Sequence, residues 1–133
     1  MTSKVTYLGE LRTSSVHIQS GSTIVSDAPT DNNGKGEAFS PTDTVANALA
    51  SCMMTVMGIK ARELEVELKD STAEVTKIMG TDPRRITEIQ IKFDMAVAAD
   101  QRTRLILERT AMTCPVLNSL HPDIKKEVFF NWK

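Results

Sequence analysis

The segment 40–62 constrains the fold most, because it predicts one long helix with no charged residue over 44–59. Apolar residues recur there at helical spacing, and small or apolar residues fill the other sides. Ser40 is the expected N-cap, Pro41 fits the first turn, and Asp43 stands where a carboxylate can reach back toward the cap. A helix that is apolar nearly all round is buried, either at the centre of a fold or at a subunit interface.

The segments around this helix predict an α+β order. Residues 4–26 predict a short antiparallel meander, and the Gly-, Asn- and Asp-rich stretch 27–36 predicts a long loop. The other expected elements are strands over 72–79 and 86–97, a helix over 101–112 capped by Asp100, a segment from Thr113 to Leu120 that restarts or continues this helix, and a last strand at 128–132. Strands and helices that are grouped rather than alternating favour α+β, here as a single domain over 1–133.

Charge and hydropathy exclude several classes of protein. Sixteen Lys and Arg against seventeen Asp and Glu give a net charge of −1. Nucleic-acid binders usually carry a basic excess, so we expect no nucleic-acid partner. No apolar run approaches the roughly 18 residues that cross a bilayer, and the amino terminus lacks the apolar core of a signal peptide. We therefore predict a soluble, cytoplasmic protein without membrane attachment.

The functional question lies in the two cysteines, Cys52 and Cys114, because a pair in a reducing cytosol is either core filling or redox chemistry. Cys52 lies on the apolar stripe of the long helix, where packing as a small hydrophobe is the simplest interpretation. Cys114 follows Thr113, a possible cap, and precedes Pro115. By backbone position alone Cys114 is the more easily ionised thiol, because a helix amino terminus stabilises a thiolate. Sequence spacing does not tell whether the two sulfurs meet.

Other site chemistries have little support in the sequence. His17 and His121 together with the cysteines lack the spacing of a zinc site. Gly34 and Gly36 precede a helix but lack the third glycine of a phosphate loop. We therefore expect neither a metal nor a cofactor.

Two segments resemble the cysteine motifs of the OsmC/Ohr family, the osmotically inducible and organic-hydroperoxide-resistance proteins. The first is 39–58, which reads FSPTDTVANALASCMMTVMG, and the second is 113–116 (TCPV) followed by Ser119 and Leu120. Motif order, chain length and element order also match, and the chain is most similar to the small, uncharacterised OsmC-like branch. The resemblance implies an OsmC-like fold of curved antiparallel sheets around a long buried central helix. It also implies an intertwined homodimer with active sites at the interface.

The same resemblance implies a thiol-dependent peroxidase that reduces organic hydroperoxides. Cys52 matches the cysteine that attacks the peroxide, and Cys114 matches the one that resolves the sulfenic acid into a disulfide. Arg12 takes the place of the arginine that activates the thiolate. An apolar pocket would suit an alkyl or lipid-like hydroperoxide, and an unknown dithiol would return the enzyme to its reduced form.

One departure from the family pattern concerns the carboxylate that holds this arginine. The peroxidases place a glutamate directly after the helix-start proline, where this chain has Thr42. Asp43 and Glu37 are the two candidate supporting carboxylates. The loss of the glutamate keeps a second hypothesis open, in which a non-catalytic dimer binds a small apolar ligand or senses oxidants.

Overall fold

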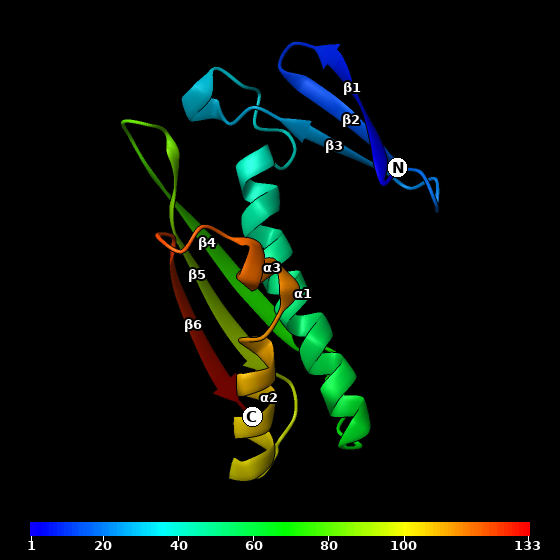
Figure 1. Ribbon diagram of the computed structural model, residues 1–133, viewed down its shortest axis with the longest axis vertical. Helices are drawn as coiled ribbons and strands as arrows, with labels where there is room; N and C mark the ends of the chain where they lie inside the picture. Colours follow the sequence, from blue (N-terminus) through cyan, green and yellow to red (C-terminus); the bar gives the residue numbers. More distant parts are fainter. The chain divides into compact units, whose positions relative to one another are not determined.

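The computed structural model describes all residues, Met1–Lys133, which form two compact units, Met1–Val45 and Ala46–Lys133. Each unit holds one three-stranded sheet, and the helices follow the first sheet in the chain (Figure 1). The predicted α+β class is confirmed. The expectation of a single domain stays a prediction.

The amino-terminal unit is an antiparallel sheet in the order β1-β2-β3, followed by a loop. Glu10 and Leu11 form the turn between the first two strands, and both have positive φ, 53° and 61°. A two-residue turn in which both residues have a left-handed backbone conformation is typical of β-hairpins, because its twist matches the right-handed twist of the two strands. The elements are β1 (Ser3–Gly9), β2 (Arg12–His17), β3 (Thr23–Asp27) and a single 3₁₀ turn, η1 (Thr30–Asn32). The predicted meander and loop are therefore confirmed.

The long helix α1 runs over Pro41–Glu63, as the sequence predicts. The backbone N–H of Ser40 donates to Asp43 Oδ2 at 3.0 Å, and the backbone N–H of Asp43 donates to Ser40 Oγ at 3.0 Å. This reciprocal pair is a capping box, so the predicted helix start is confirmed residue by residue.

Within the carboxyl-terminal unit, α1 is a core helix. Its buried residues are Ala46, Leu49, Ala50, Met53, Met57 and Ala61. By length and composition alone, with a mean hydropathy of 1.2, α1 is apolar enough to cross a membrane. The prediction from the sequence concerned an unbroken apolar run, which α1 lacks because Ser, Thr, Asn and Gly interrupt it. The buried residues of α1 pack in one core with those of the second sheet, which accounts for part of the apolar composition.

The second sheet has the order β4-β5-β6 and corrects one detail of the predicted fold. β4 (Thr72–Gly80) and β5 (Arg85–Met95) are antiparallel, whereas β5 and β6 (Lys125–Trp132) are parallel. The sheets are therefore not antiparallel throughout. The chain leaves β5 through α2 (Gln101–Ala111) and α3 (Pro115–Ser119), and a crossover of this kind returns the next strand in the same direction.

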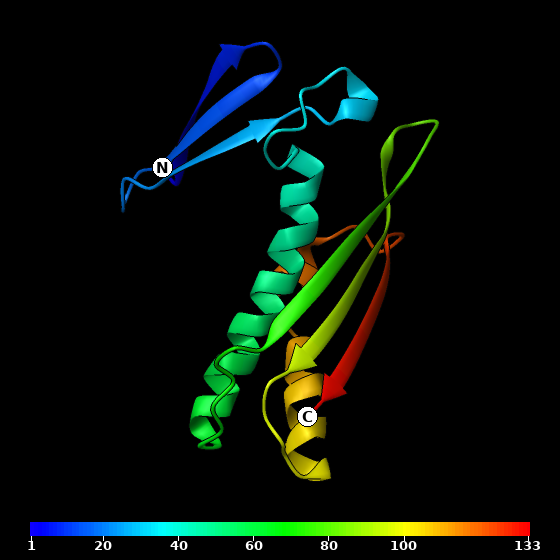
Figure 2. The ribbon, with the colours of Figure 1, turned by 180° about the vertical axis from the view of Figure 1, so that it is seen from behind.

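The core of this unit lies between the second sheet and the helices that cover one of its faces (Figures 1 and 2). Ile89, Ile91, Phe93 and Met95 alternate along β5 and are buried, as their spacing predicts. The ring of Phe93 stacks on that of Phe130, with centroids 5.1 Å apart. Buried residues of α2 and the start of α3 complete the core and bring Cys114 into it.

Candidate active site

The two cysteines meet within the carboxyl-terminal unit. Cys52 lies in the middle of α1 and is half-buried, whereas Cys114 at the start of α3 is fully buried. Both are free thiols, and the Cys52 side chain is near enough to that of Cys114 to act on its pKa. The spacing of the two cysteines in the sequence did not predict whether they meet. The chain brings them together because it passes through α2 back to α1.

Cys114 is itself the N-cap of α3, and Pro115 occupies the first turn. Its sulfur accepts a hydrogen bond from the backbone N–H of Leu117 at 3.3 Å. Thr113, which the sequence offered as a possible cap, does not cap α3. The Thr113 hydroxyl instead donates to the carbonyl of Thr110 at 2.7 Å, at the end of the preceding helix.

The environment of Cys114 favours its neutral thiol. Burial raises the pKa of the Cys114 thiol, and the neighbouring Cys52 side chain raises it further. The N–H of Leu117 acts in the opposite direction but does not outweigh burial. Backbone position alone predicted that Cys114 is the more easily ionised thiol of the pair. The structure adds burial, which raises the Cys114 pKa and outweighs the effect of the helix start.

The surroundings of the thiol pair are apolar. Cys114 belongs to the same buried cluster as Met53, Leu107 and Ala111, and Cys52 packs against that cluster. No group of three His, Cys, Asp or Glu side chains in the chain is arranged to hold a metal ion.

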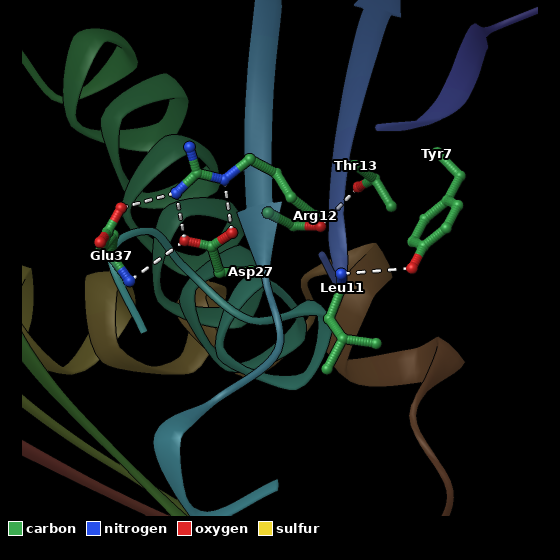
Figure 3. Close-up of polar contacts among 7 residues, drawn as sticks. Tyr7, Leu11, Arg12, Thr13, Asp27 and Glu37 are labelled. Carbon is green, nitrogen blue, oxygen red and sulfur yellow. Dashed lines mark hydrogen bonds and ion pairs between the residues drawn. The ribbon is translucent and has the colours of Figure 1, made fainter. Parts of the chain in front are cut away.

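Arg12, in the amino-terminal unit, is held by two carboxylates (Figure 3). Its Nε donates to Asp27 Oδ1 at 2.7 Å, and its Nη2 donates to Asp27 Oδ2 at 2.8 Å. Nη2 also donates to Glu37 Oε2 at 2.9 Å. These carboxylates raise the pKa of Arg12, whose guanidinium is therefore permanently charged.

Of the two candidate supporting carboxylates, Glu37 contacts Arg12, and Asp43 forms the capping box with Ser40. Sequence reasoning missed Asp27, which was assigned to the beginning of the loop. The strand register in the structure shows the pairing, because Arg12 and Asp27 face each other across β2 and β3. Cross-strand partners of opposite charge are expected to pair.

A family profile and a similar solved structure both relate this chain to one protein family. The sequence profile described as OsmC-like protein matches residues 34–128. A candidate osmotic stress induced and detoxification response protein from Psychrobacter arcticus is 54% identical, with a TM-score of 0.96 over 98% of this chain and 96% of that chain. Comparison with curated proteins gives no significant match.

More distant structures share the fold alone. An organic hydroperoxide resistance protein OsmC from Legionella pneumophila is 14% identical, with a TM-score of 0.72 over 98% of this chain and 97% of that chain. One from Elizabethkingia anophelis is 12% identical, with a TM-score of 0.76 over 100% of this chain and 97% of that chain. The profile covers most of the chain, and one relative shares more than half of its residues. The chain therefore belongs to the OsmC-like family.

Proposed function

We propose that this protein is a thiol-dependent peroxidase that reduces organic hydroperoxides. Family membership supports a redox role and a part in the oxidative stress response in general. The observation that carries the specific proposal is the pairing of two free thiols, one half-buried and one fully buried, in an apolar environment.

In the proposed reaction the Cys52 thiolate attacks the terminal oxygen of the hydroperoxide. An S–O bond forms as the O–O bond breaks, and the leaving alkoxide takes a proton to become an alcohol. The Cys114 sulfur then attacks the sulfenic sulfur and expels water, which leaves a Cys52–Cys114 disulfide. An external dithiol restores both thiols by exchange and is itself oxidised.

The assignment of roles follows from accessibility. A peroxide can reach the half-buried Cys52 more readily than Cys114, which has no exposed surface. Cys114 is suited to the second step, the attack on the sulfenic acid, because the sulfur that it attacks belongs to the neighbouring side chain of Cys52. The apolar surroundings favour an alkyl or lipid-like hydroperoxide over hydrogen peroxide.

Arg12 is the proposed activator of the Cys52 thiolate, as the family resemblance implies. A guanidinium stabilises a thiolate and can orient peroxide oxygens through its N–H groups. Glu37 is the proposed supporting carboxylate, because it bonds the same guanidinium. Asp43 is the weaker candidate, since its carboxylate caps α1.

A cytoplasmic homodimer with active sites at the interface is the proposed assembly. The first sheet exposes large apolar side chains on its strands; they include Val5, Tyr7, Leu8, Val16, Ile24 and Val25. Exposed apolar surface of this kind marks an interaction site, which supports a partner subunit there. Sedimentation equilibrium should give twice the chain mass.

The thiol content before and after peroxide addition tests the proposal. Wild-type protein should consume an alkyl hydroperoxide and gain an intramolecular disulfide, with turnover when a dithiol is supplied. Cys52→Ser should abolish consumption, and unchanged turnover in that variant would rule the mechanism out. Cys114→Ser should still react once and accumulate a sulfenic acid, which dimedone traps.

A second candidate is a non-catalytic protein that senses oxidants or binds a small apolar ligand. It is favoured by the pairing of Arg12 with two carboxylates, which lowers the positive charge available to a thiolate. Consumption of one equivalent of peroxide without recycling by a dithiol would indicate sensing. Unreactive cysteines at neutral pH would indicate binding.

A further inference from the structure

The carboxylate of Asp27 is the main partner of Arg12. Asp27 is 1% exposed, and its two oxygens accept from Nε and Nη2 of Arg12 at 2.7 and 2.8 Å (Figure 3). The backbone N–H of Glu37 also donates to Asp27 Oδ2, at 3.1 Å. The Arg12 guanidinium holds the pKa of Asp27 below its usual range, so the carboxylate is ionised at neutral pH.

The strand register produces this pair of hydrogen bonds between the Arg12 guanidinium and the Asp27 carboxylate, the Arg12–Asp27 fork. Arg12 begins β2 and Asp27 ends β3, and the two residues are direct partners in the antiparallel pair. A short, bidentate contact between a guanidinium and a carboxylate fixes the plane of both groups. A flexible side chain of arginine thereby loses most of its rotamer freedom before any substrate binds.

The fork also determines which donors of Arg12 are left. Nε and Nη2 are engaged by Asp27 and Glu37, whereas Nη1 has no hydrogen-bond partner within the amino-terminal unit (Figure 3). Glu37 is a weaker restraint than Asp27, because its side chain is 65% exposed and its contact is single. The orientation of Nη1 therefore depends chiefly on Asp27.

Asp27 has two opposite effects on an arginine that must assist a thiolate. Its negative charge reduces the attraction of the guanidinium for another anion, while its fork holds the free N–H donors in one direction. If the attraction between the guanidinium and the thiolate dominated, removal of the Asp27 charge would speed the reaction. If the orientation of the guanidinium dominated, the same change would slow it. The two carboxylates together outweigh the charge of the single guanidinium, which leaves directed N–H donation as the contribution that Arg12 can make.

We infer that Asp27 is a positioning residue for Arg12 in the proposed peroxidase reaction. Asp27 fixes the orientation of the Arg12 guanidinium through the bidentate fork. The inference rests on the proposed function. It assigns no contact between Asp27 and the peroxide.

The test is a set of variants assayed for alkyl hydroperoxide consumption with a dithiol. Asp27→Asn keeps the size of the side chain but loses the charged fork, and kcat/KM should fall by about 100-fold, the order expected when a catalytic group loses its position. Arg12→Lys keeps the charge but has no fork, so it should show a loss of similar size. Glu10→Gln removes an exposed carboxylate of the same unit and should match the wild type.

A double variant separates positioning from a general effect on the fold. If Asp27 acts through Arg12, then Asp27→Asn in the Arg12→Lys background should cause little further loss. Independent, multiplying losses would overturn the inference, as would an unchanged or faster Asp27→Asn enzyme. Wild-type activity in Arg12→Lys would overturn it even if Asp27→Asn fails to fold. A wild-type protein that consumes no hydroperoxide would instead refute the proposed function, and the inference with it.

Discussion

Oxidation of the thiol pair should raise the thermal stability of the chain. Cys52 packs against the buried cluster that contains Cys114, and its side chain acts on the Cys114 pKa, so the two thiols are neighbours. The link would close a loop of about 60 residues, and the entropy it removes from the unfolded chain corresponds to about 4 kcal/mol. Because each kcal/mol moves the Tm of a chain of this size by about 3–4 °C, we expect a rise of up to about 15 °C.

Thermal unfolding followed by circular dichroism measures this shift. Protein reduced with excess phosphine is compared with protein treated with one equivalent of tert-butyl hydroperoxide, at the same concentration. Mass spectrometry of the treated sample should show the loss of two hydrogen atoms and one peptide pair linked through Cys52 and Cys114. The Cys52→Ser and Cys114→Ser variants are the matched controls and should show no rise.

Two results would refute this reasoning. If peroxide joined separate chains through disulfides instead, the two sulfurs of one chain would not be neighbours in solution. If the intramolecular disulfide formed but the Tm fell, the buried position of Cys114 would not accommodate the bond. The strain in the folded chain would then exceed the stabilisation gained from the lower entropy of the unfolded chain.

Three further predictions concern the thiols and the helix start. Cys52 should react with iodoacetamide before Cys114, because Cys114 is fully buried and its thiol pKa is raised; time-resolved labelling that found the reverse order would contradict the site. The raised pKa also predicts that stability falls as the pH rises above the ordinary thiol value of about 8.5, where the unfolded chain loses its proton before the folded one. Urea unfolding from neutral to alkaline pH in reductant should therefore show a steeper loss for wild type than for Cys114→Ala. Ser40→Ala should cost about 1 kcal/mol and lower the Tm by about 3–4 °C, because it removes one half of the capping box; an unchanged Tm would count against that contact.

Local patterns in the sequence predicted the elements that depend on local chemistry. The capping box of α1 needs only Ser40 and Asp43 at the right spacing, and both contacts form. The buried face of β5 follows from strict alternation. In both cases the deciding interaction involves residues near one another along the chain, so a single sequence contains the necessary information.

The features that sequence analysis missed depend on distant parts of the chain. The direction of β6 is set by the crossover through α2 and α3, and no pattern within the strand itself records it. The thiol of Cys114 stands at a helix start, which lowers a pKa, but packing of α2 and the sheet buries it and reverses the sign. Asp27 was missed because its partner lies across a strand pair whose register the sequence did not specify.

The sulfur of Cys114 links redox chemistry to backbone structure in a single atom. It accepts the N–H of Leu117 and thereby closes the first turn of α3. A sulfur engaged in a disulfide is a poorer acceptor, so oxidation should loosen that turn while the rest of the core stays in place. The position of the Leu117 amide resonance in a nuclear magnetic resonance spectrum would then report whether Cys114 is a free thiol or part of a disulfide.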